Sequence, residues 1–206
     1  MDWRMIFRRS PNRWMTVVGD PAQTGNPAGV ASWGETLAPY VADRWELKEL
    51  SVNYRTPQDI ADVANQLLPE IAADQEPAIA LRGTGTGVAY AARAELAGAL
   101  PEIARRAGEG LVGIITSDAD LDWAREAVSE ALGDAPGSDQ VGIDAEVLVV
   151  STAEAKGLEF DEVVLIEPAA IVAASPQGLQ DLYVAITRAT QGLSVFADQP
   201  LPWDEG

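Results

Sequence analysis

The chain has 206 residues, a size that suits one domain with an additional segment or two small domains. It contains neither cysteine nor histidine, which excludes disulfides, thiolate catalysis, Ser-His-Asp triads and zinc sites built from these ligands. Hydrophobic residues make up 47% and charged residues 22%, as in globular proteins, and no apolar run approaches the roughly 20 residues of a membrane span. We therefore expect a cytoplasmic protein that makes no membrane contact.

The charge is strongly acidic and unevenly distributed. Thirty-two acidic residues against 14 basic ones give a net charge of −18. Residues 111–206 carry 18 acids and three bases, a net of −15, whereas residues 1–110 carry 14 acids and 11 bases, a net of −3. Such a surface repels phosphate backbones and disfavours broad nonspecific nucleic-acid binding. The charge indicates either simple solubility or a partner with a basic protein surface.

Apolar runs alternate with amphipathic stretches, and several of the runs are apolar throughout, as in strands buried on both faces. In the first half of the chain we expect strands at 14–18 and 47–52, a helix at 57–68 capped by Thr56, a strand at 88–92 and a helix at 94–107. A strand at 111–116 and a helix at 121–132, capped by Ser117 or Asp118, follow. The last expected elements are strands at 147–150 and 163–166, a helix at 177–189 and a strand at 193–197. Loops or turns are expected at 21–34, 83–87 and 133–140, and a loose tail at 199–206. The pattern predicts an α/β fold with a mainly parallel sheet and helices on both faces.

Two polar clusters follow expected strands in the first third of the chain. Gln23 ends the run Gly-Asp-Pro-Ala-Gln after the first strand, where it is placed to sense a phosphate or orient a water, because α/β sheets bind ligands beyond the carboxyl ends of their strands. The alternative is a plain turn. Tyr54 and Arg55 come immediately before a helix, as an aromatic for stacking on a base and a guanidinium for a phosphate. Alternatively, Tyr54 packs at the strand end and Arg55 pairs with Asp59.

Two further clusters lie in the acidic half. Lys156 and Gly157, between two buried strands, combine a cation with a flexible turn, or form an ordinary loop. Arg188 stands near the end of the last expected helix and is one of the three bases after residue 110. A charge so isolated indicates either pairing with a carboxylate or a site for an anionic ligand.

In order and spacing, the four clusters resemble motifs III, IV, V and VI of superfamily 1 helicases of the UvrD, Rep and PcrA type. The matching runs are GDPAQ at 19–23, NYRT at 53–56, KGLEF at 156–160 and YVAITRA at 183–189. The resemblance covers nearly the whole chain, although residues 80–145 carry no motif. It implies a RecA-like three-layer αβα domain of the P-loop NTPase superfamily, without the P-loop itself.

The resemblance also implies roles for single residues. Arg55 and Arg188 resemble the two arginines that contact the γ-phosphate of ATP, and Gln23 resembles the glutamine that couples this phosphate to nucleic-acid binding. Phosphoryl transfer needs positive charge at the transferring oxygens, and an arginine finger accelerates it by about 10³–10⁵. For nucleotide binding, Tyr54 resembles the aromatic on adenine and Glu159 the acid near the ribose, while Lys156 and Gly157 belong to the same nucleotide-binding loop.

Half of an ATP site is missing from the sequence. The 206 residues contain no G-x-x-x-x-G-K-[ST] phosphate-binding loop, and no Asp-Glu metal-binding pair precedes Gly19. We expect the first RecA-like domain of a longer parent chain to complete the site with ATP and Mg²⁺, and this chain alone neither to bind ATP tightly nor to hydrolyse it. Residues 1–42 are then a remnant of that first domain with motif III and the linker, 43–198 the second RecA-like domain and 199–206 a tail. Residues 1–18 are expected to pack back on the second domain or to pair with another copy in a homodimer.

Two departures bear on the partner. Helicases of this type continue motif III into W-R-G-A, which stacks on bases, whereas no arginine follows Trp33 here. Their T-x-H before motif V is replaced by Ser151 and Ala153, with Glu154 adjacent. With the runs TVVGDPAQT and ELSVNYRTP, these changes are similar to HelD-type proteins, helicase-like ATPases that bind RNA polymerase and help release it from nucleic acids. The resemblance implies RNA polymerase as the partner; the alternatives are a UvrD-like DNA helicase in repair or replication and a non-enzymatic interaction module.

Overall fold

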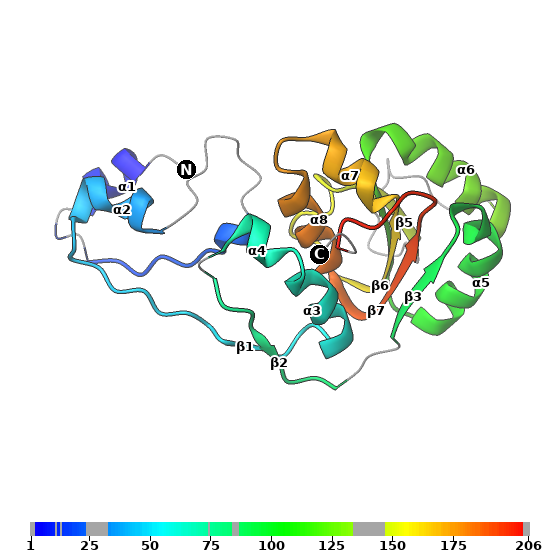
Figure 1. Cartoon of the computed structure of the whole chain (residues 1–206), viewed down its shortest axis with the longest axis horizontal. Coiled ribbons are helices and arrows are strands. Elements are labelled where there is room, and N and C mark those ends of the chain that lie inside the picture. Colours follow the sequence, from blue (N-terminus) through cyan, green and yellow to red (C-terminus); the bar gives the residue numbers. More distant parts are fainter. Residues whose placement is uncertain are drawn as a thin grey trace.

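The computed structural model describes residues 3–10, 12, 14–23, 33–73, 75–83, 87–133 and 147–203. At its centre a five-stranded sheet has the order β3-β7-β6-β4-β5, with every neighbouring pair parallel (Figure 1). Its strands are β3 (Val88–Ala91), β4 (Val112–Thr116), β5 (Val147–Ser151), β6 (Phe160–Ile166) and β7 (Ala189–Phe196). A separate parallel pair joins β1 (Val52–Asn53) to β2 (Ile79–Ala80). The parallel α/β sheet predicted from the apolar runs is confirmed.

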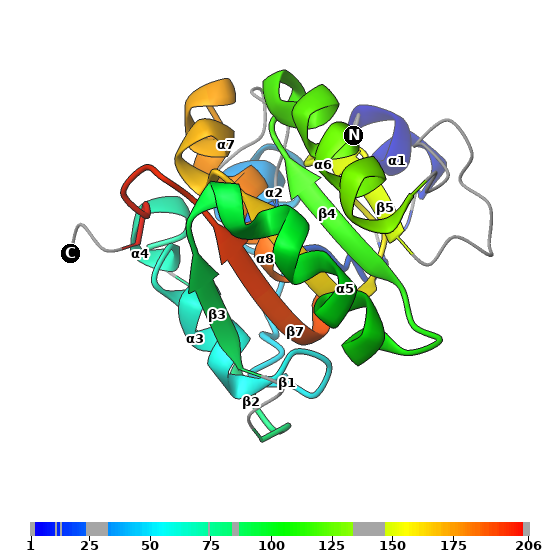
Figure 2. The same cartoon turned by 90° about the vertical axis from the view of Figure 1, so that its right-hand side faces the viewer.

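Helices cover both faces of the sheet, as Figures 1 and 2 show. One face carries α5 (Leu96–Ala107) and α6 (Leu121–Leu132); the other carries α3 (Gln58–Asn65), α4 (Leu68–Ile71), α7 (Pro168–Ala174) and α8 (Gly178–Ile186). Side chains of β6 alternate between two apolar cores, since Val163 and Leu165 pack towards α3 and α8 whereas Val164 and Ile166 pack towards α5 and α6. The three-layer arrangement follows from strands that are apolar on both faces.

The connection from β5 to β6 determines where polar loops gather. β5 and β6 are separated in the sheet by β4, so residues 152–159 cross from the carboxyl end of β5 to the amino end of β6. Ala155 in this crossing is fully buried in the core shared with α3 and α8. The crossing therefore delivers residues 156–159 to the amino-terminal edge of the sheet, where β7 also begins.

The amino-terminal segment departs from expectation. Residues 14–18 pair with no other strand among the described residues, and Trp14 is 88% exposed. The predicted strand is wrong there because an apolar run needs a neighbouring strand for its backbone hydrogen bonds. α1 (Trp3–Arg9) packs on α2 (Trp33–Val41) rather than on the sheet: the rings of Phe7 and Tyr40 stack at 4.9 Å, and Trp3 meets Trp33 edge-on at 6.4 Å. Figure 1 shows both helices at the opposite end of the molecule from α5 and α6.

Several element ends also differ. The strand expected at 47–52 is observed only as the two-residue strand β1, Val52–Asn53. Pro57 rather than Thr56 is the N-cap of α3, because the Asn53 side chain accepts the Arg55 and Thr56 N–H groups in a turn that ends just before the proline. A short 3₁₀ turn, η3 (Asp118–Asp120), precedes α6, so Asp120 caps that helix instead of Ser117 or Asp118.

The carboxyl-terminal third holds further corrections. α7 was not predicted from the sequence. α8 ends at Ile186 rather than at residue 189, since the Thr187 hydroxyl donates to the carbonyls of Tyr183 and Val184 and closes the helix. The expected loose tail is wrong at Trp203, which is buried in the core beside α3 and α8. Most of the expected turn at 83–87 and of the loop at 133–140 lies outside the described residues. No helix among the described residues is long and apolar enough to cross a membrane.

Candidate functional site

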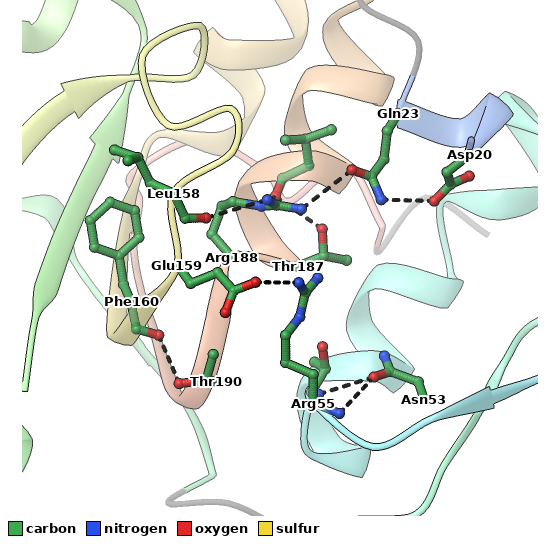
Figure 3. Close-up of polar contacts among 12 residues, drawn as sticks. Asp20, Gln23, Asn53, Arg55, Leu158, Glu159, Phe160, Thr187, Arg188 and Thr190 are labelled. Atoms are coloured by element: carbon green, nitrogen blue, oxygen red, sulfur yellow. Dashed lines mark hydrogen bonds and ion pairs between the residues drawn. The ribbon is translucent and has the colours of Figure 1, made fainter. Parts of the chain in front are cut away.

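Four residues singled out from the sequence converge at the amino-terminal edge of the sheet (Figure 3). Arg188 lies between α8 and β7, Glu159 directly precedes β6, and Arg55 lies between β1 and α3. Gln23 reaches them from a 3₁₀ turn, η1 (Pro21–Gln23), which packs against α8. The site thus forms at the amino ends of β6 and β7, whereas we had expected ligand groups beyond carboxyl ends.

Arg188 is the centre of the site and is almost fully buried, with 5% of its surface exposed. Its Nε donates to the Val184 carbonyl at 3.1 Å, its Nη1 to the Leu158 carbonyl at 3.3 Å, and its Nη2 to Gln23 Oε1 at 3.3 Å. All three acceptors are neutral. Within the described parts of the chain no carboxylate lies at ion-pair distance from this guanidinium.

The electrostatic surroundings of Arg188 are unfavourable to its charge. Burial lowers the pKa of Arg188, and the positive charge of Arg55 lowers it further, against smaller opposing effects of Glu159, Asp20 and Tyr183. An arginine nevertheless keeps its proton in proteins. The fold therefore holds a charged guanidinium in a buried position, and no carboxylate of the described residues pairs with it.

Arg55 is held in a different way. Its Nη1 pairs with Glu159 Oε1 at 2.5 Å, and the two side chains are 39% and 53% exposed. Its backbone N–H donates to Asn53 Oδ1 at 2.9 Å, so the turn at Asn53 orients the arginine. The pairing with Asp59 considered above is replaced by the pairing with Glu159, which leaves both side chains accessible to a ligand.

Gln23 is oriented by its own loop. Its Nε2 donates to Asp20 Oδ2 at 2.8 Å, and the other oxygen of Asp20 accepts the Ala22 N–H at 3.0 Å. These contacts direct the amide oxygen of Gln23 towards Arg188. The loop is therefore more than a plain turn, because its amide contacts the buried guanidinium.

The other predicted site residues do not join these contacts. Tyr54 is 77% exposed beside Arg55, with its ring open to solvent. Lys156 Nζ pairs with Asp181 Oδ1 at 2.9 Å, which ties the crossing segment to α8. Gly157 has a φ of +86°, a conformation that suits glycine and turns the chain towards Glu159.

The sequence assigned no role to three residues of this region, although Asn53 and Tyr183 lie within the quoted motifs. Asn53 orients Arg55, and its position two residues before Arg55 is a signal for a side-chain-to-backbone turn. Tyr183 lies on α8 near Asp20, and burial raises its pKa to about 12. Arg82 donates to the carbonyls of both Arg55 and Thr190, a contact that no sequence pattern indicates.

The loop after β5 is closed by its own acid. Glu154 Oε2 accepts the Ser151 N–H at 2.8 Å, and Ser151 Oγ accepts the Glu154 N–H at 3.3 Å. The Ser151 N–H is thus already bonded to a carboxylate, and an external phosphate would meet a negative charge at this loop.

Residues 146–196 match the family model of the UvrD-like helicase C-terminal domain. This segment contains Glu159 and Arg188 but neither Gln23 nor Arg55. No curated protein matches the chain.

Two solved structures are similar to this chain. The C-terminal domain of a possible DNA helicase from Lactobacillus plantarum WCFS1 has a TM-score of 0.52 and 23% identity, over 74% of this chain and 92% of that one. The SWI2/SNF2 ATPase core of Sulfolobus solfataricus, in complex with dsDNA, has a TM-score of 0.41 and 11% identity, over 76% of this chain and 35% of that one. The first similarity confirms the α/β fold with a parallel sheet that the motifs predicted for a RecA-like helicase C-terminal domain.

Proposed function

We propose that this chain is the second motor domain of a helicase-like ATPase and supplies half of an ATP site. On this proposal residues 43–198 form that domain, residues 1–42 belong to the first RecA-like domain, and a parent chain provides the phosphate-binding loop. Arg188 and Arg55 contact the γ-phosphate, Glu159 the ribose and Tyr54 the adenine, while Gln23 connects Arg188 to the first domain.

The single observation that carries the proposal is the buried charge of Arg188, which has no ion-pair partner among the described residues. Removing a charge from water without a counter-ion costs several kcal/mol, a free energy comparable to the entire free energy of unfolding of many domains. Its three neutral acceptors recover part of this cost. An anion such as a phosphate would supply the missing counter-charge, which explains why the arginine is retained there. An interaction module would have no such reason, since its arginines would be expected to pair internally.

The chemistry of the site follows from the guanidinium geometry. Arg188 is held by α8, by the crossing segment before β6 and by η1, so its fork is fixed before a ligand arrives. Fixed positive charge at the transferring phosphoryl group lowers the barrier without reorganisation during the reaction. On this proposal the Mg²⁺ that accompanies ATP is held by residues of the first domain.

For the parent protein we propose a HelD-like action on RNA polymerase. The closed loop at Ser151 and Glu154 supports this proposal, because it places a carboxylate where the resemblance expects polynucleotide-contacting groups. The net charge of −18 also suits a basic protein surface better than a phosphate backbone. A DNA helicase is the second candidate, favoured by the match of residues 146–196 to the UvrD-like family.

The test is the steady-state ATPase of the full-length parent, alone, with single-stranded DNA and with RNA polymerase. We expect stable binding to the polymerase, turnover indifferent to DNA, and a loss of about 10³–10⁵ in Arg188→Ala. Arg105→Ala is the matched control, since Arg105 pairs with Glu102 on the exposed surface of α5. Stimulation by DNA without polymerase binding would favour the helicase, and full turnover in Arg188→Ala would refute the shared ATP site. The isolated chain should show no turnover.

A further inference from the structure

Arg82 joins the two segments that carry the site arginines. Its Nη1 donates to the Arg55 carbonyl at 3.0 Å and to the Thr190 carbonyl at 2.7 Å. Arg55 lies 27 residues away in the sequence and Thr190 lies 108 residues away. Thr190 is two residues beyond Arg188, so one nitrogen atom connects the loop of Arg55 to the start of β7.

The Arg55 segment needs such a connection. On its amino-terminal side the chain is held by β1 and β2, a ladder of two residue pairs, with the Leu81 N–H donating to the Asn53 carbonyl. Val52, Ile79 and Leu81 are all exposed, so this ladder gains little from apolar burial. Arg82 follows Leu81 directly and extends the contact from β2 to the central sheet.

The positions of Arg55 and Arg188 are also mutually unfavourable. The charge of Arg55 lowers the pKa of Arg188, which means that the two guanidinium groups repel each other across the site. Glu159 restrains the side chain of Arg55, whereas the spacing between the Arg55 main chain and β7 calls for a main-chain contact. The contact between Arg82 and the two carbonyls acts on this spacing.

The contacts around the start of β7 form a closed circuit. From Arg82 the circuit passes to the Thr190 carbonyl, and the Thr190 hydroxyl donates to the Phe160 carbonyl at 3.1 Å. Phe160 follows Glu159, which pairs with Arg55, whose carbonyl returns to Arg82. A displacement at Arg82 is therefore transmitted to the arginine and to the acid of the site.

We propose that Arg82 is a positioning residue that sets the distance between Arg55 and Arg188 for phosphoryl transfer. The inference rests on the proposed ATP site and extends it to a region of the chain that carries no helicase motif. Arg82 acts through the main chain of Arg55 and is not itself assigned a contact with the nucleotide.

The experiment compares variants of the full-length parent by kcat and KM for ATP. Because a misplacement of about 1 Å can cost about 10²-fold in rate, we expect Arg82→Ala to lower kcat at least about 10-fold while KM for ATP changes less than about 2-fold. Arg82→Lys should recover most of the loss, since an ammonium group can donate to both carbonyls. Arg105→Ala is the control and should behave as the wild type.

Two further measurements separate positioning from general loss of structure. In an Arg55→Ala background, Arg82→Ala should cause little additional loss, because its effect passes through Arg55. ADP with aluminium fluoride should bind more weakly to Arg82→Ala, whereas ADP alone should bind unchanged. An unchanged kcat in Arg82→Ala, or a loss fully additive with that of Arg55→Ala, would overturn the inference. If Arg55→Ala itself leaves kcat unchanged, the proposed ATP site fails instead.

Discussion

Two arginines on opposite faces of the sheet provide a test of the charge argument on the isolated chain. Arg106 forms a bidentate pair with the buried Glu162, at 2.9 and 2.6 Å, whereas Arg188 contacts neutral acceptors. Replacing Arg106 by Met leaves the Glu162 carboxylate buried without its guanidinium, at an expected cost of about 3–5 kcal/mol. Replacing Arg188 by Met removes the buried charge itself.

The expected magnitude for Arg188→Met follows from two opposing contributions. Three hydrogen bonds are lost, which are worth about 1 kcal/mol each or somewhat more. The Val184 carbonyl keeps the Thr187 hydroxyl as a partner, so two of the three acceptors lose their donor. The relief of several kcal/mol of desolvation opposes this loss. We therefore expect a net change in the free energy of unfolding within about 1 kcal/mol of zero.

The assay is urea unfolding of the isolated wild-type chain, Arg106→Met and Arg188→Met at neutral pH. Equal slopes of the transitions allow the midpoints to be compared as stabilities. We expect Arg106→Met to be clearly destabilised and Arg188→Met to have a stability close to that of the wild type. An Arg188→Met variant as unstable as Arg106→Met would refute it, because Arg188 would then be a structural residue rather than one kept for a ligand.

Three other predictions concern residues around the site. Burial raises the pKa of Tyr183 from 10.0 to about 12, so the unfolded chain loses this proton at a lower pH than the folded chain. The free energy of unfolding should therefore fall between pH 10 and 12 by up to about 3 kcal/mol. Urea unfolding of Tyr183→Phe should lack this decrease, and equal pH profiles of the two proteins would contradict the assignment. Gly113→Ala would place a Cβ 2.5 Å from the Phe160 ring, so denaturation should show a loss of about 1–3 kcal/mol that Phe160→Leu partly restores; an unaffected midpoint would exclude the clash. Gly157→Ala should cost about 1–2 kcal/mol at a φ of +86°, whereas the control Gly98→Ala, in open space within α5, should be neutral or stabilising by thermal unfolding.

The sequence predicted the central sheet well because burial on both faces leaves a direct trace in composition. The runs at 111–116, 147–150 and 163–166 contain almost no polar residue and became β4, β5 and most of β6. The same criterion failed at 14–18, where an equally apolar run has no neighbouring strand among the described residues and stays unpaired. Local composition indicates that a segment can be a strand, but pairing depends on other segments.

The candidate site was predictable in its residue types but not in its geometry. The isolation of Arg188 in an acidic half of the sequence indicated either a carboxylate partner or an anionic ligand. In the structure its guanidinium donates to three neutral acceptors. No periodicity could indicate that Arg82 reaches Thr190, because this contact depends on how the segment after β2 lies relative to the start of β7. Trp203 was missed for the same reason, since a proline-containing tail shows no pattern that reveals its burial.

The distribution of internal ion pairs is compatible with the phosphate site that we propose in this acidic protein. Most cations of the sheet domain are neutralised by a neighbouring acid, as seen in the pairs Arg93–Asp120, Arg106–Glu162, Arg125–Asp122 and Lys156–Asp181. Arg188 lacks such a partner in the described structure, and Arg55 is paired with Glu159, whose side chain is exposed. A buried guanidinium without an ion pair among the described residues therefore lies at the amino ends of β6 and β7, in a chain whose net charge is −18. On the proposed function a small anion meets a fixed guanidinium here, whereas a long polyanion would also be repelled by the net charge of −18, which favours a nucleotide over a nucleic acid at this position.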